Sequence, residues 1–142
     1  MKKPLLFFMA SILLIGCSKD DEPAIDPIVG QFRLVEASMD GESPELEVCQ
    51  ERFTMEFTIL NTGAYTLYGD DQDTQCAVSA IANLDWQKKG DRYRITSEIP
   101  FFAGLSIPTN SAEATLKNNV LTIAFNYSGH DYGIVFQKTN SQ

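Results

Sequence analysis

The stretch "ATLKNNVLTIAFNYSGHDYGIVF", residues 114–136, decides the fold. Apolar residues alternate with polar ones on both sides of Asn118-Asn119 and of Gly129-His130. Asparagine and glycine tolerate a positive φ and therefore suit tight hairpin turns. A period of two between turn residues is typical of half-buried antiparallel strands. This stretch therefore predicts a three-stranded meander.

The register of each expected hairpin follows from its turn, because residues that face one another lie at equal distances from it. Turns at 118–119, 129–130, 89–90 and 61–63 predict these pairs: Leu116–Leu121 and Ala114–Ile123; Tyr127–Tyr132, Phe125–Ile134 and Ile123–Phe136; Trp86–Tyr93 and Leu84–Ile95; Ile59–Tyr65 and Phe57–Leu67. Apolar residues meet on one face in every case, as cross-strand packing requires. A slip of one residue would turn these side chains into solvent.

The same pattern extends over the chain after residue 30, and no segment has a convincing helical period. The expected strands cover 31–38, 51–60, 64–69, 76–87, 91–97, 103–107, 111–117, 120–127 and 131–138. We expect an all-β fold, an antiparallel up-and-down barrel of eight or nine strands, because closure removes exposed sheet edges. A barrel of eight strands is just wide enough to be filled by side chains or to hold one small ligand.

The first 16 residues have the layout of a secretory signal peptide, with Lys2 and Lys3 before an apolar run over 5–15. That run is shorter than the roughly 20 residues that a membrane-spanning helix needs. Leu14-Ile15-Gly16-Cys17 resembles the lipobox of bacterial lipoproteins. The resemblance implies that Cys17 becomes the N-terminus and carries a diacylglyceryl group, which would anchor the chain to a membrane.

Residues 17–28 are expected to form a lipidated acidic tether, and residues 29–142 the barrel domain. The segment 18–28, "SKDDEPAIDPI", holds four acids and two prolines and has no periodicity. Lys19 to Glu22 resembles an acidic export signal of surface lipoproteins in some Gram-negative bacteria. We expect an outer-membrane location with display at the cell surface, and retention on the periplasmic face is the alternative.

Three cysteines are an odd number for a secreted protein. If Cys17 is acylated, Cys49 and Cys76 remain as an even pair in an oxidising compartment. The register around 61–63 places Cys49 within one residue of a position opposite Cys76. We therefore expect a disulfide, and two separate reduced thiols are the alternative.

Four segments in sequence order resemble the lipocalin-like domain of bacterial outer-membrane lipoproteins: "IVGQFRLVEA" (28–37), "TGAYTLY" (62–68), "LDWQKKGDRYRIT" (84–96) and "ATLKNNVLTIAF" (114–125). Gly30, Phe32 and Leu34 match the family's opening Gly-x-Trp-x-Leu, with Phe32 in place of the tryptophan. Leu84 stands where a glycine often occurs. The resemblance implies a barrel that can enclose a cavity, and it supplies no catalytic residues.

Charge and motifs narrow the function. Loss of Lys2 and Lys3 with the leader takes the net charge from −8 to −10, which disfavours nucleic-acid binding. His130 is expected to be a plain turn residue, and residues 69–75 a solvated acidic loop, because Cys76 stands where a calcium-binding EF-hand needs glycine. Glu36, Glu56 and Asp85 should face water. We expect no enzyme activity, no catalytic residue, no metal and no cofactor.

The stretch "EIPFFAGLSIP", 98–108, breaks the alternating pattern and is expected to form either a plug in the barrel end or an apolar lid at its mouth. The aromatic side chains of Trp86, Tyr93, Phe101 and Phe102 are candidate contacts for a small apolar ligand. The alternative function is a structural or accessory protein of a cell-surface complex, with envelope proteins as its partners and no ligand of its own.

Overall fold

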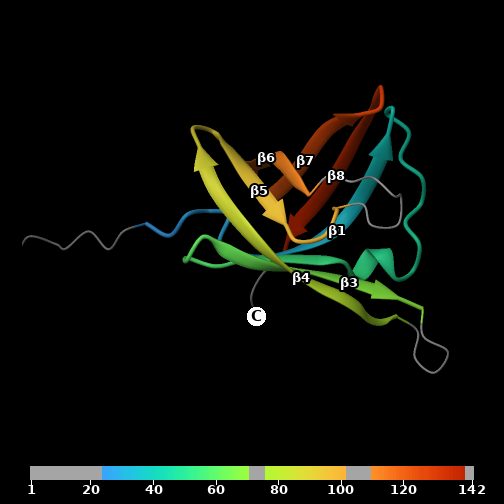
Figure 1. The fold of residues 1–142 in the computed structure, drawn as a ribbon, viewed down its shortest axis with the longest axis horizontal. Coiled ribbons are helices and arrows are strands. Elements are labelled where there is room, and N and C mark those ends of the chain that lie inside the picture. The colour runs from blue at the N-terminus through green and yellow to red at the C-terminus, as the bar shows by residue number, and fades with distance from the viewer. Residues whose placement is uncertain (1–23, 71–75, 102–109, 140–142) are drawn as a thin grey trace, which may run out of the picture.

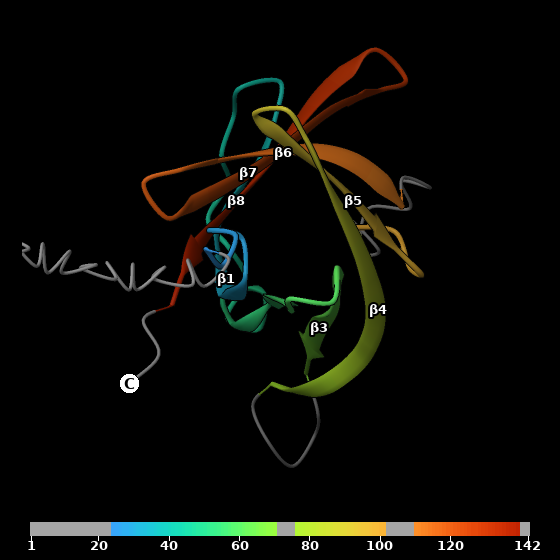
Figure 2. The ribbon, with the colours of Figure 1, turned by 90° about the vertical axis from the view of Figure 1, so that its left-hand side faces the viewer.

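The computed structural model describes residues 24–70, 76–101 and 110–139, which form eight strands in one closed antiparallel barrel. The strands pair in chain order, and β1 also pairs with β8 to close the sheet (Figures 1 and 2). The up-and-down barrel expected from the sequence is confirmed. The bounds are β1 (Gly30–Met39), η1 (Gln50–Arg52), β2 (Thr54–Phe57), β3 (Thr62–Gly69), β4 (Ala77–Lys89), β5 (Arg92–Ser97), β6 (Ser111–Lys117), β7 (Val120–Tyr127) and β8 (His130–Lys138).

The expected ninth strand, 103–107, lies outside the described residues, as do the leader, the start of the tether and Phe102. The expected strand over 51–60 is wrong at both ends, because the short helix η1 occupies 50–52 and β2 ends at Phe57. Within the described ranges, no helix has the length and apolar character needed to span a bilayer.

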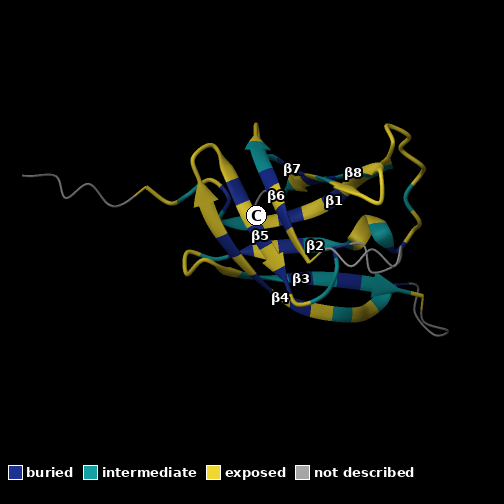
Figure 3. Cartoon of the chain, turned by 45° about the horizontal axis from the view of Figure 1, so that its top comes forward, coloured by how far each residue is buried: buried dark blue, intermediate teal, exposed yellow. Residues whose placement is uncertain are grey.

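The barrel interior is filled by the alternate residues of every strand. In β5 the exposed and buried classes alternate without a break, and Figure 3 shows the same banding on its neighbours. Aromatic rings take much of the space: Tyr65 packs against Phe53, Phe101 and Phe136, and Phe32 packs edge-on against Phe57. Every buried side-chain nitrogen or oxygen of the described residues has a hydrogen-bond partner. The interior therefore presents no unpaired polar group to a guest.

The register predicted around Asn118-Asn119 is confirmed. Leu116 faces Leu121 and Ala114 faces Ile123. Asn118 has a φ of 51° and Asn119 a φ of 66°. Two consecutive positive φ values give the turn whose twist matches that of the flanking strands. Asparagine adopts this backbone more readily than most residues, which is why the sequence located this turn correctly.

The other three registers were wrong. Trp86 faces Ile95 and Phe125 faces Tyr132, because the turns lie at 90–91 and at 128–129, where Ser128 has a φ of 53° and Gly129 one of 86°. In the first hairpin Met55 faces Tyr65, and residues 58–61 form a four-residue turn that leaves Ile59 exposed. Each error shifts the pairing by an even count, so the expected pairs keep to the correct face within the strands, although Ile59 and Tyr127 are exposed at the strand ends.

The two ends of the barrel differ. The described chain begins at the end that carries the short turns 58–61, 90–91 and 118–119, which we call the N-terminal end. The opposite end, called the loop end, carries the long β1–β2 connection, 40–53, and the last residues of β3 and β5. Figure 1 shows the chain entering at the left and the β1–β2 connection at the right. Ile28 is fully buried at the N-terminal end and closes the core there.

Candidate functional site

Three of the four aromatic residues singled out from the sequence lie in the packed core: Trp86, Tyr93 and Phe101. Trp86 and Tyr93 contact each other with ring centroids 6.0 Å apart, toward the N-terminal end. The indole Nε1 of Trp86 donates a hydrogen bond to the carbonyl oxygen of Thr58 at 3.1 Å. Phe101 lies at the other end of the core, 2% exposed. The structure thus does not bring Phe101 together with Trp86 and Tyr93.

Phe101 is buried at the barrel end, while residues 102–108 of the segment expected to form a plug or a lid lie outside the described residues. The carbonyl oxygen of Phe101 accepts a hydrogen bond of 3.1 Å from the hydroxyl of Tyr65 in the barrel interior. Burial raises the pKa of the Tyr65 phenol well above its ordinary value, so Tyr65 stays a neutral donor. This contact ties the chain after β5 to the centre of the barrel.

A pocket lined by described residues lies at the loop end, outside the barrel interior. Its volume is about 700 Å³, and its walls come from the β1–β2 connection, η1 and the end of β3. A second hollow of about 310 Å³ lies further along the same connection, beside Met39 and Pro44. The lining of the larger one, called the loop-end pocket, is Glu47, Val48, Cys49, Gln50, Phe53, Tyr68, Gly69 and Asp70. Trp86, Tyr93 and Phe101 line neither hollow, and their role in ligand binding stays a prediction.

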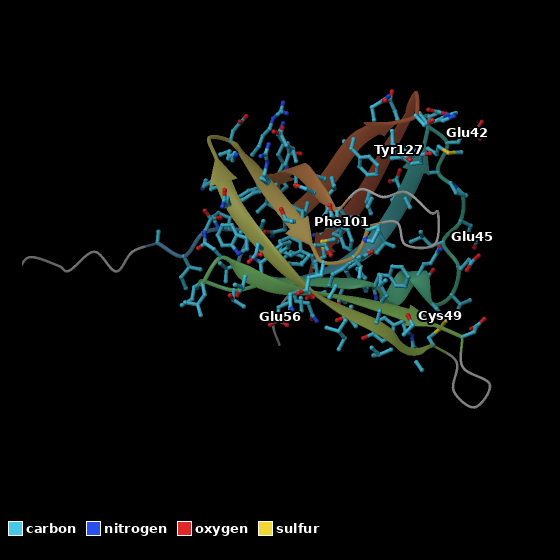
Figure 4. The ribbon with its side chains drawn as sticks, in the orientation of Figure 1. Glu42, Glu45, Cys49, Glu56, Phe101 and Tyr127 are labelled. Atoms are coloured by element: carbon cyan, nitrogen blue, oxygen red, sulfur yellow. A yellow bond between two sulfur atoms is a disulfide. The ribbon has the colours of Figure 1, made fainter. Side chains whose placement is uncertain are left out.

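A disulfide positions one wall of the loop-end pocket. Cys49 and Cys76 are joined, with their Cα atoms 5.1 Å apart, as the sequence led us to expect. The register from which the pair was inferred is wrong. The bridge nevertheless forms, because Cys49 directly precedes η1, Cys76 directly precedes β4, and the fold places these two positions side by side. Figure 4 shows Cys49 at the base of the β1–β2 connection, with Glu42 and Glu45 further along it. The bridge thus fixes that connection to the barrel wall.

Local hydrogen bonds shape the turn that carries the pocket. The amide nitrogen of Glu47 donates to the side-chain oxygen of Gln50 at 3.0 Å, and the amide of Gln50 donates back to the carbonyl of Glu47 at 2.8 Å. These reciprocal bonds resemble a helix cap and begin η1. Val48 is left 69% exposed on this turn. An apolar side chain is thereby held at the mouth of the pocket.

The pocket combines apolar walls with an acidic rim. Val48, Phe53 and Tyr68 supply the apolar surface, and Glu47 and Asp70 supply carboxylates. Such a lining suits a small molecule with an apolar body and hydrogen-bond donors or positive charge. Geometry alone also groups Asp70 with the two bridge sulfurs as potential metal ligands. A disulfide sulfur is not a thiolate, and thiolate is the form in which cysteine binds metal, so the oxidised protein lacks that donor set.

His130 is not a turn residue, contrary to the expectation. It begins β8, because the turn lies at Ser128-Gly129. Its Nδ1 lies 2.6 Å from a carboxylate oxygen of Asp40, and the amide of Asp131 donates to the other oxygen of Asp40 at 2.9 Å. The hydrogen bond with His130 lowers the pKa of Asp40. This pair ties the start of the β1–β2 connection to β8.

A polar cluster that the sequence did not reveal lies at the N-terminal end. The carboxylate of Asp26 accepts hydrogen bonds from the Tyr93 hydroxyl at 2.6 Å, from Nζ of Lys88 at 2.9 Å and from the amide of Ile28 at 3.1 Å. Partial burial alone would raise the pKa of Asp26, but these hydrogen bonds together lower it. Nζ of Lys138 donates to the carbonyls on both sides of Ile28 at 2.7 Å. The chain before β1 is thereby clamped to the barrel.

The acids considered for catalysis face water. Glu36, Glu56 and Asp85 are all exposed, each on the outer face of a different strand. Their placement agrees with the expectation from the alternating pattern. The three carboxylates therefore lie on separate parts of the outer barrel wall and share no cavity.

The comparisons with known proteins support the fold. No family model and no curated protein matches the chain. A solved lipocalin-like protein from Bacteroides uniformis shares 13% identity at a TM-score of 0.50, covering 79% of this chain and 98% of that chain. A solved, uncharacterized protein from Bacteroides eggerthii shares 16% identity at a TM-score of 0.49, covering 79% and 99%. The closed eight-stranded barrel and the likeness to the Bacteroides uniformis protein thus show a lipocalin-like fold.

Proposed function

We propose that this protein is a lipid-anchored envelope lipoprotein whose lipocalin-like barrel binds a small, largely apolar ligand in the loop-end pocket. The anchor would be the thioether-linked lipid on Cys17, in an outer membrane and facing the cell surface. Support for the anchor comes from the leader, the lipobox resemblance and the acidic segment after Cys17. Protease treatment of intact cells tests the orientation: degradation supports surface display, and protection until the outer membrane is opened contradicts it.

One observation carries the choice of pocket. The barrel interior is packed with rings, whereas the loop-end pocket offers about 700 Å³, within the range of about 300–1,000 Å³ that small-molecule sites occupy. A ligand that contacts Trp86, Tyr93 and Phe101 inside the barrel would require these buried side chains to part. The loop-end pocket requires no such movement. It also offers a bridge-fixed wall, which limits the ordering cost of binding.

Native mass spectrometry of the protein extracted from its own membranes tests this function. We expect a small molecule to co-purify with the wild type and to be lost from Val48→Trp, which fills the mouth of the pocket. Ile59→Trp is the matched control, because Ile59 is 69% exposed in the β2–β3 turn at the opposite end of the barrel. Equal retention by both variants would contradict the loop-end site.

A second candidate function is that of an accessory protein in a cell-surface complex. Val78 is 51% exposed and Ile81 67% exposed, both on β4. Exposed apolar residues on one strand suit contact with a partner protein. Crosslinking in intact cells tests this alternative: adducts that disappear in Ile81→Ser support it, and monomer alone under all growth conditions contradicts it.

A further inference from the structure

Exposed apolar side chains gather at the N-terminal end of the barrel. Ile25 is 70% exposed, and Ile59 and Leu60, at the tip of the β2–β3 turn, are 69% and 76% exposed. These values are among the highest for large apolar residues in the described chain. None of the three is needed to fill the core. Their exposure therefore calls for an explanation outside the barrel.

Three contacts hold these residues at the same end. The β2–β3 turn is fixed by the hydrogen bond from Trp86 to the carbonyl of Thr58. The ring of Trp86 packs on Tyr93, and Tyr93 donates to Asp26, the neighbour of Ile25. Figure 1 shows the β2–β3 turn and the chain before β1 together at the left. The apolar tips thus lie at the same end of the barrel, and we call them the N-terminal tip surface: Ile25, Ile59 and Leu60.

Basic side chains surround this surface, although the protein as a whole is acidic. Of the eight lysines and arginines in the described residues, five lie in the turns or at strand ends here: Lys88, Lys89, Arg92, Lys117 and Lys138. Asp26 and Asp91 are the acidic residues of the same turns and of the chain before β1. Two of the five cations are ion-paired: Lys88 with Asp26 at 2.9 Å and Arg92 with Glu113 at 3.1 Å. The clustering is a property of the fold, because these cations come from three separate parts of the sequence.

The loop end has the opposite charge. The β1–β2 connection, 40–53, carries one cation, Arg52, and five acidic residues: Asp40, Glu42, Glu45, Glu47 and Glu51. An anionic lipid surface therefore repels the loop end and not the N-terminal end. The acidic residues 20–22 offset much of the basic charge, so the N-terminal end is near neutral rather than strongly cationic. The charge difference thus favours an orientation in which the N-terminal end faces an anionic lipid surface, and the apolar side chains at that end supply the contact with the lipid.

The position of Cys17 points to what covers this surface. Seven peptide steps separate Cys17 from Ala24, where the described chain begins. A fully extended chain spans at most about 3.6 Å per residue, so a lipid on Cys17 would keep this end within about 25 Å of the bilayer. Such a short connection makes even a weak contact with the membrane effectively intramolecular.

We propose that the N-terminal tip surface rests on the lipid leaflet, with Ile25, Ile59 and Leu60 among the headgroups. The acidic loop end and its pocket then face away from the membrane. Apolar side chains next to lysines are the composition that binds at a bilayer interface. This inference rests on the proposed lipid anchor, and it adds that the barrel has a fixed orientation on the membrane instead of swinging freely on its tether.

The test uses the full chain, produced with its leader, purified in its lipidated form and reconstituted into vesicles of phosphatidylethanolamine and phosphatidylglycerol. With Cys17 acylated and Cys49 and Cys76 joined, Leu60→Cys supplies the one free thiol, which is labelled with the polarity-sensitive fluorophore NBD; Glu45→Cys is the matched label at the loop end. Both positions are exposed, so neither substitution disturbs the core. Ile59→Ser in the Leu60→Cys background tests whether the neighbouring tip residue is needed.

We expect NBD at position 60 to be blue-shifted and quenched by lipids that carry a spin label near the headgroup, whereas NBD at position 45 remains in water and is not quenched. Ile59→Ser should reduce the quenching at position 60. Protein that stays on the vesicles after a carbonate wash but shows no quenching at either position would overturn the docking alone. Protein that the wash releases would overturn the lipid anchor, and the docking with it.

Discussion

Removal of the Cys49–Cys76 bridge should destabilise the barrel by an amount that the chain length of the closed loop sets. The two cysteines are separated by 27 residues in the sequence. Loop-closure entropy for a loop of that length gives about 3.5 kcal/mol at 25 °C. Both side chains are buried, so alanine is the substitution that adds no polar group to the core.

The double variant C49A/C76A should therefore unfold in urea at a midpoint about 1.2–3.5 M below that of the wild type, for a domain with a urea slope of about 1–3 kcal/mol per molar. Equilibrium unfolding followed by the fluorescence of Trp86 provides the assay. A reductant is the control: it should lower the wild-type midpoint to that of the variant and leave the variant unchanged. The β1–β2 connection also loses its tie to β4, so ligand retention should fall together with stability.

An unchanged midpoint in C49A/C76A would refute the reasoning, because the bridge would then not constrain the unfolded chain. A reductant that lowers the midpoint of the double variant as well would show that the effect does not come from this disulfide.

Three further predictions concern single residues. Gly63→Ala places a Cβ 2.0 Å from the carbonyl oxygen of Glu56, so it should lower the free energy of unfolding in urea by about 2–3 kcal/mol. The control Gly69→Ala, whose Cβ lies 3.3 Å from Ser79, should lower it less. Equal losses of stability would contradict the β2–β3 register. Asn119→Val puts a β-branched residue at a φ of 66° and should lower the free energy of unfolding by about 1–2 kcal/mol, whereas Asn119→Gly should be near neutral; the reverse order would exclude the proposed turn. Asp26→Asn removes a carboxylate with a lowered pKa. Burial raises this pKa, but three hydrogen bonds outweigh burial and bring it below the unfolded value of 3.8. That carboxylate stabilises the fold above about pH 4 and loses its effect as the pH falls through the folded pKa. The variant should therefore have a lower Tm than the wild type at pH 7, and the difference in Tm should disappear in acid. A difference in Tm that does not depend on pH would contradict this assignment.

The sequence was sufficient for the fold class because alternation of side chains is read directly from residue order. It was sufficient for one register, at Asn118-Asn119, where two residues that tolerate positive φ leave a single choice of turn. It failed at Ser128-Gly129, because Gly129 suits either of two adjacent turn positions. It failed at 58–61, because a four-residue turn has no short motif and buries neither Ile59 nor Leu60.

The candidate site was less predictable than the fold. Trp86 and Tyr93 are large and aromatic, which suits a ligand pocket and a packed core equally, and here they pack on each other. The loop-end pocket depends on η1, a three-residue helix that has no periodic pattern in the sequence. The basic residues at the N-terminal end come from separate turns, so no basic stretch announces them. Only closure of the barrel brings them together.

The claim on which the site and the membrane orientation both depend is that β1 pairs with β8 around a filled interior. Nuclear Overhauser contacts measured on the isotope-labelled protein test it directly. The structure predicts contacts between the backbones of Leu34 and Phe136 and of Ala37 and Ile134, together with ring contacts from Tyr65 to Phe101 and Phe136. Absence of the β1–β8 contacts in a folded protein, with the ring of Tyr65 exposed to water, would contradict the account.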